Sequence, residues 1–246
     1  MNAKIVLMCV CITVLLVMLS SMVTAGDLVT TVSAGLSLTD GNSKTLQANA
    51  GIVSEGEKDQ LGSVRFVVEA NYGESTTDDT TETTVENAKV FGNAKKTLSE
   101  KIFAYFDTTF LYDDIALIDY RATAGPGFGL YLIKKKTTKF FVESGLSYVW
   151  EEVADMGTDY LAVRIGERFD HTFNGRGSAR IWQSIEYLPK ANDLSNYLIN
   201  AEAGAEAALN TDMNLRLVLR NKYDSEASAA LKKNDLSLIA GISIKL

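Results

Sequence analysis

The segment DLSLIAGISIKL, residues 235–246, alternates apolar side chains with small or polar ones almost without interruption. Leu236 and Leu238 share one parity, whereas Ser237 and Gly241 take the other. Successive side chains of a β-strand point to opposite faces of its sheet. The segment therefore predicts a strand with one apolar face and one polar face.

The same alternation recurs about twelve times along the chain, and no long segment with helical periodicity follows residue 26. The alternating runs cover residues 28–38, 46–52, 64–72, 88–94, 102–110, 118–132, 140–150, 161–169, 181–187, 197–205, 215–219 and 236–246. Turn-forming residues such as Asp40-Gly41-Asn42 separate several of them. This pattern predicts an all-β protein with an even number of antiparallel strands.

Two architectures use such alternation. A soluble barrel or sandwich turns the apolar face inward, whereas a transmembrane barrel turns it toward lipid and keeps the polar face in the lumen. Most of the runs are long enough, at about nine residues or more, for a tilted transmembrane strand. Charges of both signs on the polar parity favour the transmembrane alternative, because opposite charges can pair across strands inside a barrel. We therefore expect an up-and-down antiparallel transmembrane β-barrel of about twelve strands.

The charged parity also predicts a network of ion pairs in the barrel lumen. We expect its members to include Arg164, Arg168, Glu186, Glu202, Arg216 and Arg220.

Residues 1–25 have the layout of a secretory signal peptide, with Lys4 before an apolar run and small residues before Gly26. A retained membrane anchor is the competing interpretation, because the apolar run has nearly spanning length. We expect cleavage near Ala25, which leaves residues 26–246 as one barrel domain. Both cysteines lie in the first segment, so the barrel domain has no disulfide or thiolate site.

The formal net charge of −7 argues against a nucleic-acid partner. No motif indicates a cofactor. Acidic residues gather in the predicted connections, but none has the spacing of a calcium-binding loop, so we expect a solvated acidic rim and no metal site.

The lengths of the connections suggest an orientation. If both ends of the barrel domain face the periplasm, three long connections face outward, namely residues 73–82, 151–159 and 224–234. Tight connections at residues 134–137, 174–177 and 210–212 then face the periplasm, as is usual in such barrels. Aromatic residues near predicted strand ends are expected to form a girdle at the membrane interface: Tyr112, Tyr148, Trp150, Tyr187, Tyr197 and Tyr223.

Four motifs carry a resemblance to a known family. They are GPGFG at residues 125–129, GERFDH at 166–171, WQSIEYLP at 182–189 and NAEAG at 200–204. Together they resemble the YdiY-like family of salt-induced outer-membrane proteins, a family of unknown function, over nearly the whole of residues 26–246. The resemblance implies a Gram-negative outer-membrane barrel, with membrane lipid and the β-barrel assembly machinery as its partners. Leu246 departs from the terminal aromatic residue that this machinery usually reads.

Glu167 and Gln183 are polar residues on the apolar parity of their strands. Folding the chain about residues 174–177 places them roughly opposite each other, as a polar pair on the lipid face. Such a pair suggests self-association or a bound lipid headgroup. The alternative is a β-bulge near Gly166 that turns Glu167 back toward the lumen.

His171 is the only histidine, and its surroundings resemble the His-x-Ser-Asn-Gly motif of outer-membrane phospholipases. Nucleophilic catalysis would need a serine activated by this histidine, but Phe173 occupies the equivalent position and Ser178 lies beyond the turn. We therefore expect a non-enzymatic barrel with a structural or envelope salt-stress role and at most a narrow passive channel. A lipid-modifying enzyme that uses His171 is the alternative. The sequence does not specify an oligomeric state.

Overall fold

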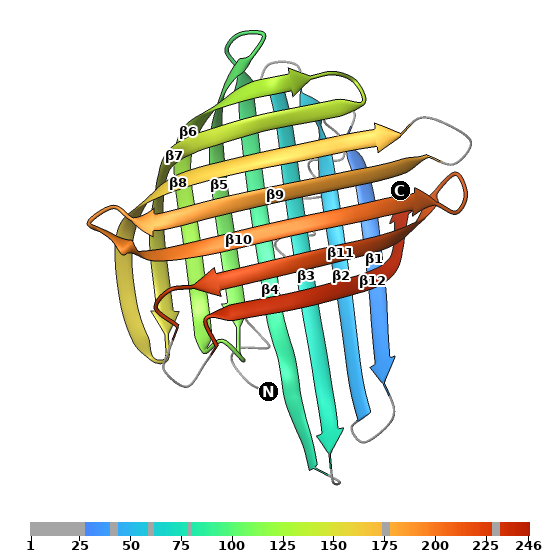
Figure 1. Cartoon of the computed structure of the whole chain (residues 1–246), viewed down its shortest axis with the longest axis vertical. Helices are drawn as coiled ribbons and strands as arrows, with labels where there is room; N and C mark the ends of the chain where they lie inside the picture. The colour runs from blue at the N-terminus through green and yellow to red at the C-terminus, as the bar shows by residue number, and fades with distance from the viewer. Residues whose placement is uncertain (1–27, 40–43, 59–61, 78–79, 174–177, 228–231) are drawn as a thin grey trace.

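Twelve antiparallel β-strands form a closed barrel in the computed structural model of the chain (Figure 1). The structure describes residues 28–39, 44–58, 62–77, 80–173, 178–227 and 232–246. The strands are β1 (Val29–Thr39), β2 (Lys44–Lys58), β3 (Gly62–Thr77), β4 (Thr80–Thr97), β5 (Ile102–Asp113), β6 (Ile118–Lys134), β7 (Thr138–Val153), β8 (Met156–Phe173), β9 (Ala179–Lys190), β10 (Asp193–Ala208), β11 (Met213–Asp224) and β12 (Asn234–Lys245). The predicted twelve-stranded barrel is confirmed. The predicted signal peptide lies outside the described residues, and no helix among the described residues is suited to crossing a membrane.

Each strand pairs with its neighbours in sequence, and β1 pairs with β12 to close the barrel. This seam joins residues 31–35 to residues 241–245, whereas β1 pairs with β2 along its whole length. Glycines allow the two seam strands to approach closely, because a Cβ on Gly35 would lie 2.5 Å from the carbonyl oxygen of Ala240. The strand at residues 235–246 thus closes the barrel, as its amphipathic pattern predicts.

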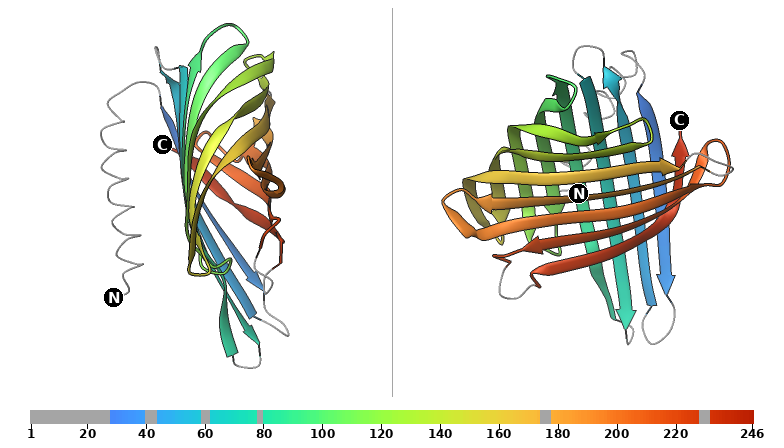
Figure 2. Two further views of the ribbon diagram at one scale, coloured as in Figure 1. Left: turned by 90° about the vertical axis from the view of Figure 1, so that its left-hand side faces the viewer. Right: turned by 45° about the horizontal axis from the view of Figure 1, so that its top comes forward.

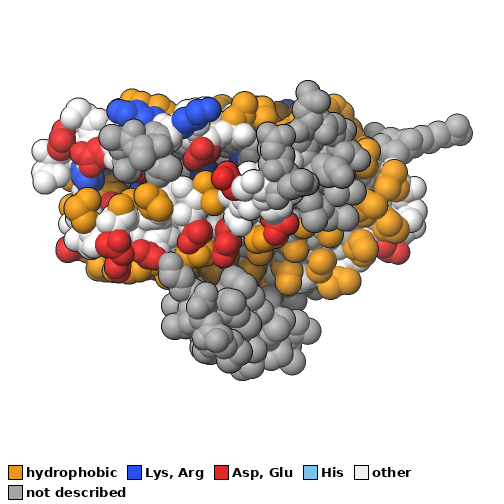
Figure 3. Space-filling model, turned by 90° about the horizontal axis from the view of Figure 1, so that it is seen from below, with side chains coloured by type: hydrophobic (Ala, Val, Ile, Leu, Met, Phe, Trp, Pro, Cys, Tyr) orange, Lys and Arg blue, Asp and Glu red, His pale blue; other side chains and the backbone are white. Residues whose placement is uncertain are grey.

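The two faces of the strands separate by polarity as expected. On β12, Leu236 and Leu238 point outward with about two thirds of their surface exposed, whereas Ser243 is fully buried on the inner face. Seen from one end, hydrophobic side chains form much of the perimeter of the molecule (Figure 3). An apolar exterior of this kind matches a lipid environment.

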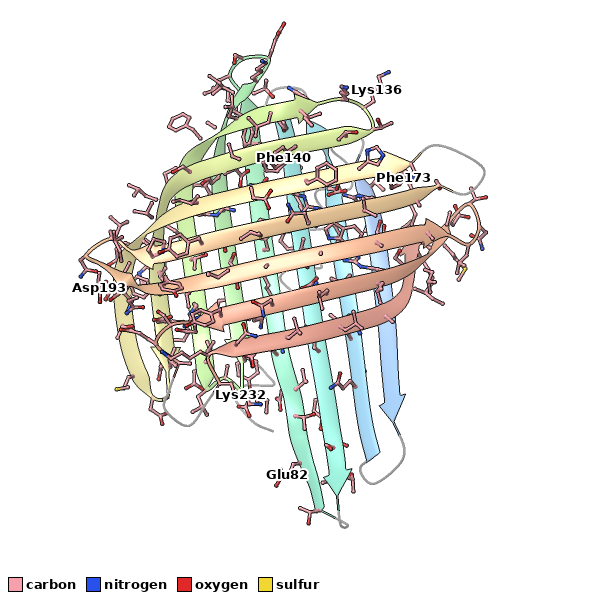
Figure 4. The ribbon with its side chains drawn as sticks, viewed as in Figure 1. Glu82, Lys136, Phe140, Phe173, Asp193 and Lys232 are labelled. Atoms are coloured by element: carbon pink, nitrogen blue, oxygen red, sulfur yellow. The ribbon has the colours of Figure 1, made fainter. Side chains whose placement is uncertain are left out.

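Aromatic residues mark both ends of the apolar exterior. At the end where β3 joins β4, which we call the loop end, Tyr197 packs against Tyr187 and Tyr223 with ring centroids 5.4 and 5.6 Å apart. At the opposite end, which we call the terminal end because β1 begins there and β12 ends there, Phe140 packs against Phe169. Phe140 and Phe173 are labelled in Figure 4, both near this end. The spacing between the two aromatic belts defines a band for the hydrocarbon core.

The prediction of long connections at residues 73–82 and 151–159 is wrong, because most of these residues belong to strands. Strand β3 continues to Thr77 and β4 begins at Thr80, so these residues form a hairpin that extends beyond the rest of the barrel, with Glu82 near its tip (Figure 4). Strands β7 and β8 are separated only by Ala154 and Asp155. Apart from residues 225–233, connection length therefore does not distinguish the two ends, and the orientation stays a prediction.

Candidate functional site

The barrel interior is organised around Arg164 on β8. Its guanidinium contacts carboxylates on three other strands: Asp107 on β5 at 3.2 Å, Glu143 on β7 at 2.9 Å and Glu186 on β9 at 2.6 Å. The Arg164 side chain is only 12% exposed, so these pairs are largely shielded from solvent. Strand alternation places all four residues on the lumen face, and the charges hold four strands together.

Several ion pairs join strands that are far apart in the sheet. Each distance is between a side-chain nitrogen and a carboxylate oxygen: Arg220 on β11 to Glu69 on β3 at 2.5 Å, Lys222 on β11 to Asp113 on β5 at 3.1 Å, Arg121 on β6 to Asp224 on β11 at 3.1 Å, and Arg180 on β9 to Glu55 on β2 at 3.5 Å. The side view shows the reason, because the barrel is flattened and its two walls lie close together (Figure 2). Opposite walls are thus bridged directly through the lumen.

Five of the six residues predicted for the lumen network contact a carboxylate or cation at 3.6 Å or less. Glu202 accepts hydrogen bonds from the Trp182 indole at 2.7 Å and from Arg220 at 2.8 Å. Arg216 lies 3.6 Å from Glu206. The structure thus brings these side chains together across β8, β9, β10 and β11.

Arg168 differs from the other five residues. Its nearest carboxylate oxygen is Oδ2 of Asp170, 3.7 Å away, and this oxygen already accepts hydrogen bonds of 3.0 and 2.5 Å from Arg180. Glu55 is in turn shared between Arg65 and Arg180. Among the side chains that the structure describes, three guanidiniums therefore face two carboxylates, and Arg168 is the surplus cation.

Lys95 is a member of the interior network that the sequence did not reveal, because it lies near the end of a weakly alternating run. Its ammonium group donates a hydrogen bond of 2.5 Å to Glu143 and lies 3.6 Å from the centroid of the Phe141 ring. Phe141 packs edge-on against Phe103 at 5.6 Å, and Tyr131 completes this aromatic cluster. Aromatic and charged side chains together fill this part of the lumen.

The glycines of the GPGFG motif make room for these aromatic rings. A Cβ on Gly129 would overlap the ring of Phe103, and one on Gly127 would overlap the ring of Tyr105. A glycine within a strand often marks such a close approach, and the motif carries no loop suited to phosphate. Gly204 accommodates the ring of Trp182 in the same way.

Little space remains between the side chains near the barrel seam. A pocket lined by Asn49, Asn71, Arg216 and neighbouring residues leaves a cavity volume of about 20 Å³ for the centres of water molecules. A volume of that size holds one or two waters. This pocket therefore has room for water but not for a larger solute.

Comparison with known proteins places the chain in a family. The family model described as "Protein of unknown function, DUF481" matches residues 32–245. The chain belongs to the DUF481 family. No curated protein sequence matches it.

Solved structures similar to this DUF481 barrel include two porins and an autotransporter domain. The NanC porin has a TM-score of 0.49 and 10% identity, over 89% of this chain and 100% of that chain. The KdgM porin has a TM-score of 0.46 and 6% identity, over 89% and 99%. The translocator domain of autotransporter NalP from Neisseria meningitidis has a TM-score of 0.45 and 9% identity, over 88% and 87%. Identities this low do not transfer a function.

Glu167 lies on the outer face of the DUF481 barrel. The predicted alternative, a bulge near Gly166, is wrong, because the register between β8 and β9 runs without a shift from Ile165 to Phe173. Glu167 pairs directly with Ile185, and Gln183, expected roughly opposite, is offset by two residues toward the terminal end of β9. Oxygen Oε1 of Glu167 is buried and accepts no hydrogen bond.

His171 also lies on the outer face, within the aromatic belt at the terminal end. Its Nδ1 is 2.8 Å from the hydroxyl of Thr138, and its ring packs against Phe169 and Phe173. It pairs in register with Ile181, and none of the described serines is hydrogen-bonded to it. The described residues thus give His171 an aromatic packing role and no serine to activate.

These surroundings predict that the protein does not hydrolyse lipid through His171. We expect detergent-solubilised protein to release no fatty acid from phospholipid, and His171→Ala to behave identically, because a serine nucleophile needs a hydrogen-bonded base. Fatty-acid release that disappears in His171→Ala would contradict this prediction.

At the loop end, Asp119, Glu152 and Asp155 hold carboxylate oxygens within 4.8 Å of one another. Oxygen ligands of this kind suit hard cations. Exposed carboxylates commonly gather without an ion, so the cluster by itself is no evidence of a metal site.

Proposed function

We propose that this protein is a non-enzymatic β-barrel of a bacterial outer membrane, with a structural role and an interior too densely bridged to pass solutes freely. The observation that carries this proposal is the set of ion pairs between strands that are not neighbours, such as Arg220 with Glu69 and Lys222 with Asp113. Each pair connects two walls of the barrel. A solute could pass only where such pairs separate.

The outer-membrane location rests on the apolar exterior, the two aromatic belts and the closed sheet. A closed barrel satisfies every backbone hydrogen bond within lipid, and barrels of this type are characteristic of outer membranes. We propose membrane lipid as its immediate surroundings and the β-barrel assembly machinery as its folding partner. The salt-stress role implied by the family resemblance stays a prediction.

Fractionation tests the location. We expect the folded protein in outer-membrane fractions, and we expect it to migrate differently on gels before and after boiling, because a closed barrel resists denaturation by detergent. Recovery as a soluble periplasmic protein would end the proposal.

A planar-bilayer measurement tests whether the interior is closed. We expect wild-type protein to give very few conductance steps, whereas a variant with Arg220→Ala and Lys222→Ala gives frequent, cation-selective steps. Both substitutions remove cations that bridge to the opposite wall, and they leave Glu69 and Asp113 to attract water and cations.

The matched control replaces Lys135 and Lys136, which are exposed in the turn between β6 and β7, with alanine. This control removes the same charge from outside the lumen and should stay as silent as wild type. Large steps from the wild-type protein would show an open channel and contradict the closed interior.

A further inference from the structure

A line of polar residues crosses the lipid-facing surface of β7, β8 and β9. It consists of Ser144, Glu167 and Gln183, and we call it the polar belt patch. All three side chains have the outward parity of their strands, next to exposed residues such as Leu146, Ile165 and Ile185. None of the three has a hydrogen-bond partner among the side chains that the structure describes.

The patch lies inside the apolar band, between the two aromatic belts. On β7, Ser144 is four residues from Phe140 of the terminal-end belt and four residues from Tyr148 at the loop end. On β9, Gln183 is four residues from Tyr187 of the loop-end belt. On β8, Glu167 is two residues from Phe169 of the terminal-end belt, so the three residues lie inside the apolar band and nearer its terminal end.

Glu167 lies between these two residues across the sheet. Its direct partners are Val142 on β7 and Ile185 on β9, so Ser144 and Gln183 are its diagonal neighbours, two residues away on either side. This stagger follows from strand tilt, because residues at equal depth on adjacent tilted strands are offset from their register partners. A carboxylate and an amide thus lie side by side on the apolar surface, where an ionisable group is costly unless it is paired.

Small side chains continue the surface next to the patch. Gln183 pairs in register with Ala203 on β10, and Ala201 and Ala205 share the outward face of that strand. Membrane protein contacts favour small residues that allow close approach, together with polar side chains that hydrogen-bond across the interface. The same surface thus offers both features.

We propose that the polar belt patch is the contact surface between two copies of this chain in the membrane. A two-fold axis along the membrane normal brings residues of equal depth together, so Glu167 of each copy meets Gln183 of the other. An amide both donates and accepts hydrogen bonds, and a carboxyl group accepts them in either protonation state. The Gln183 amide of each copy therefore donates a hydrogen bond to the Glu167 carboxyl group of the other. Such a self-complementary patch is the hallmark of a two-fold interface.

A lipid headgroup fits the patch less well than a second copy. Headgroups lie at the interfaces, whereas the patch lies inside the apolar band, and a headgroup does not offer the self-complementary amide and carboxyl pair that a second copy does. The inference rests on the proposed transmembrane placement of the barrel. The gel-mobility control distinguishes a failure of that placement from a failure of the dimer.

Disulfide crosslinking tests the dimer. In the full chain, with Cys9 and Cys11 replaced by serine, Ile185→Cys places a thiol between Glu167 and Gln183, close to the proposed axis. Leu217→Cys on β11 is the matched control, because Leu217 is 48% exposed and Ile185 is 45% exposed on the same outward face. We expect disulfide-linked dimers from oxidised membranes that carry Ile185→Cys and none from those that carry Leu217→Cys.

The polar contacts are tested in the Ile185→Cys background. Glu167→Leu should lower the crosslinked fraction roughly tenfold, because interhelical and interstrand polar contacts in membranes contribute on the order of one tenfold factor. Glu167→Gln should keep it, because two amides still pair. A shift in gel mobility on boiling shows that each variant is folded.

The proposal is overturned if folded Ile185→Cys crosslinks no more than Leu217→Cys, or if Glu167→Leu leaves crosslinking unchanged. Loss of a co-purified phospholipid from a monomeric Glu167→Leu variant would instead assign the patch to a lipid. A variant that shows no boiling shift would contradict the barrel and not the dimer.

Discussion

Replacing Arg164 with methionine should destabilise the barrel by roughly 3 kcal/mol or more, because the loss of one partner leaves buried charges uncompensated. The guanidinium of Arg164 is shared by Asp107, Glu143 and Glu186, which come from three strands. Without it, Glu143 keeps the cation of Lys95, whereas Asp107 and Glu186 keep only the neutral amides of Asn93 and Asn200 among the described side chains. The like charges then repel one another across the flattened lumen.

The measurement is the urea midpoint of unfolding in detergent, followed by the mobility shift on unboiled gels. Arg168→Met is the matched control, because it removes the same group from the same face of β8, four residues away. Arg168 is the surplus cation beside Arg65 and Arg180, so its removal should leave the midpoint unchanged or raise it. Equal losses in the two variants would show that interior arginines stabilise by volume and not by pairing.

Replacing Gly129 with leucine should prevent the barrel from closing correctly. The added side chain would occupy the space of the Phe103 ring, which is 1% exposed and packs against Phe141 and Tyr131. Overpacking a core costs about 1–3 kcal/mol and more where nothing can move. We expect the unboiled gel band of folded protein to be lost or strongly reduced.

A second substitution distinguishes a clash from a general intolerance of strand glycines. In the Gly129→Leu background, Phe103→Ala removes the overlapping ring and should restore much of the folded band. Gly157→Ala is the control, because a Cβ there meets no atom within 4 Å. If Phe103→Ala fails to rescue, the role assigned to Gly129 is wrong.

The sequence by itself determined the strand number, the faces of the strands and the pairing that closes the barrel. These features are local, because period-two alternation assigns each side chain to a face from its immediate neighbours, and a shift by one residue would expose every charge of a strand to lipid. For the same reason the parity of Arg164, Glu186, Glu202, Arg216 and Arg220 identified them as lumen residues. The predicted loops at residues 73–82 and 151–159 were wrong, because polar hairpins outside the membrane carry no apolar face and therefore no alternation.

Only the tertiary structure decided which charges meet. The flattening of the barrel brings β11 against β3, β5 and β6, so Arg220 and Lys222 reach carboxylates more than a hundred residues away in the chain. Alternation cannot indicate such partners, because it specifies a face and not the curvature of the sheet. The same holds for Glu167, whose outward position depends on an unbroken register between β8 and β9. A strand pattern determines which side of the wall a residue occupies, whereas the shape of the closed wall determines what that residue touches.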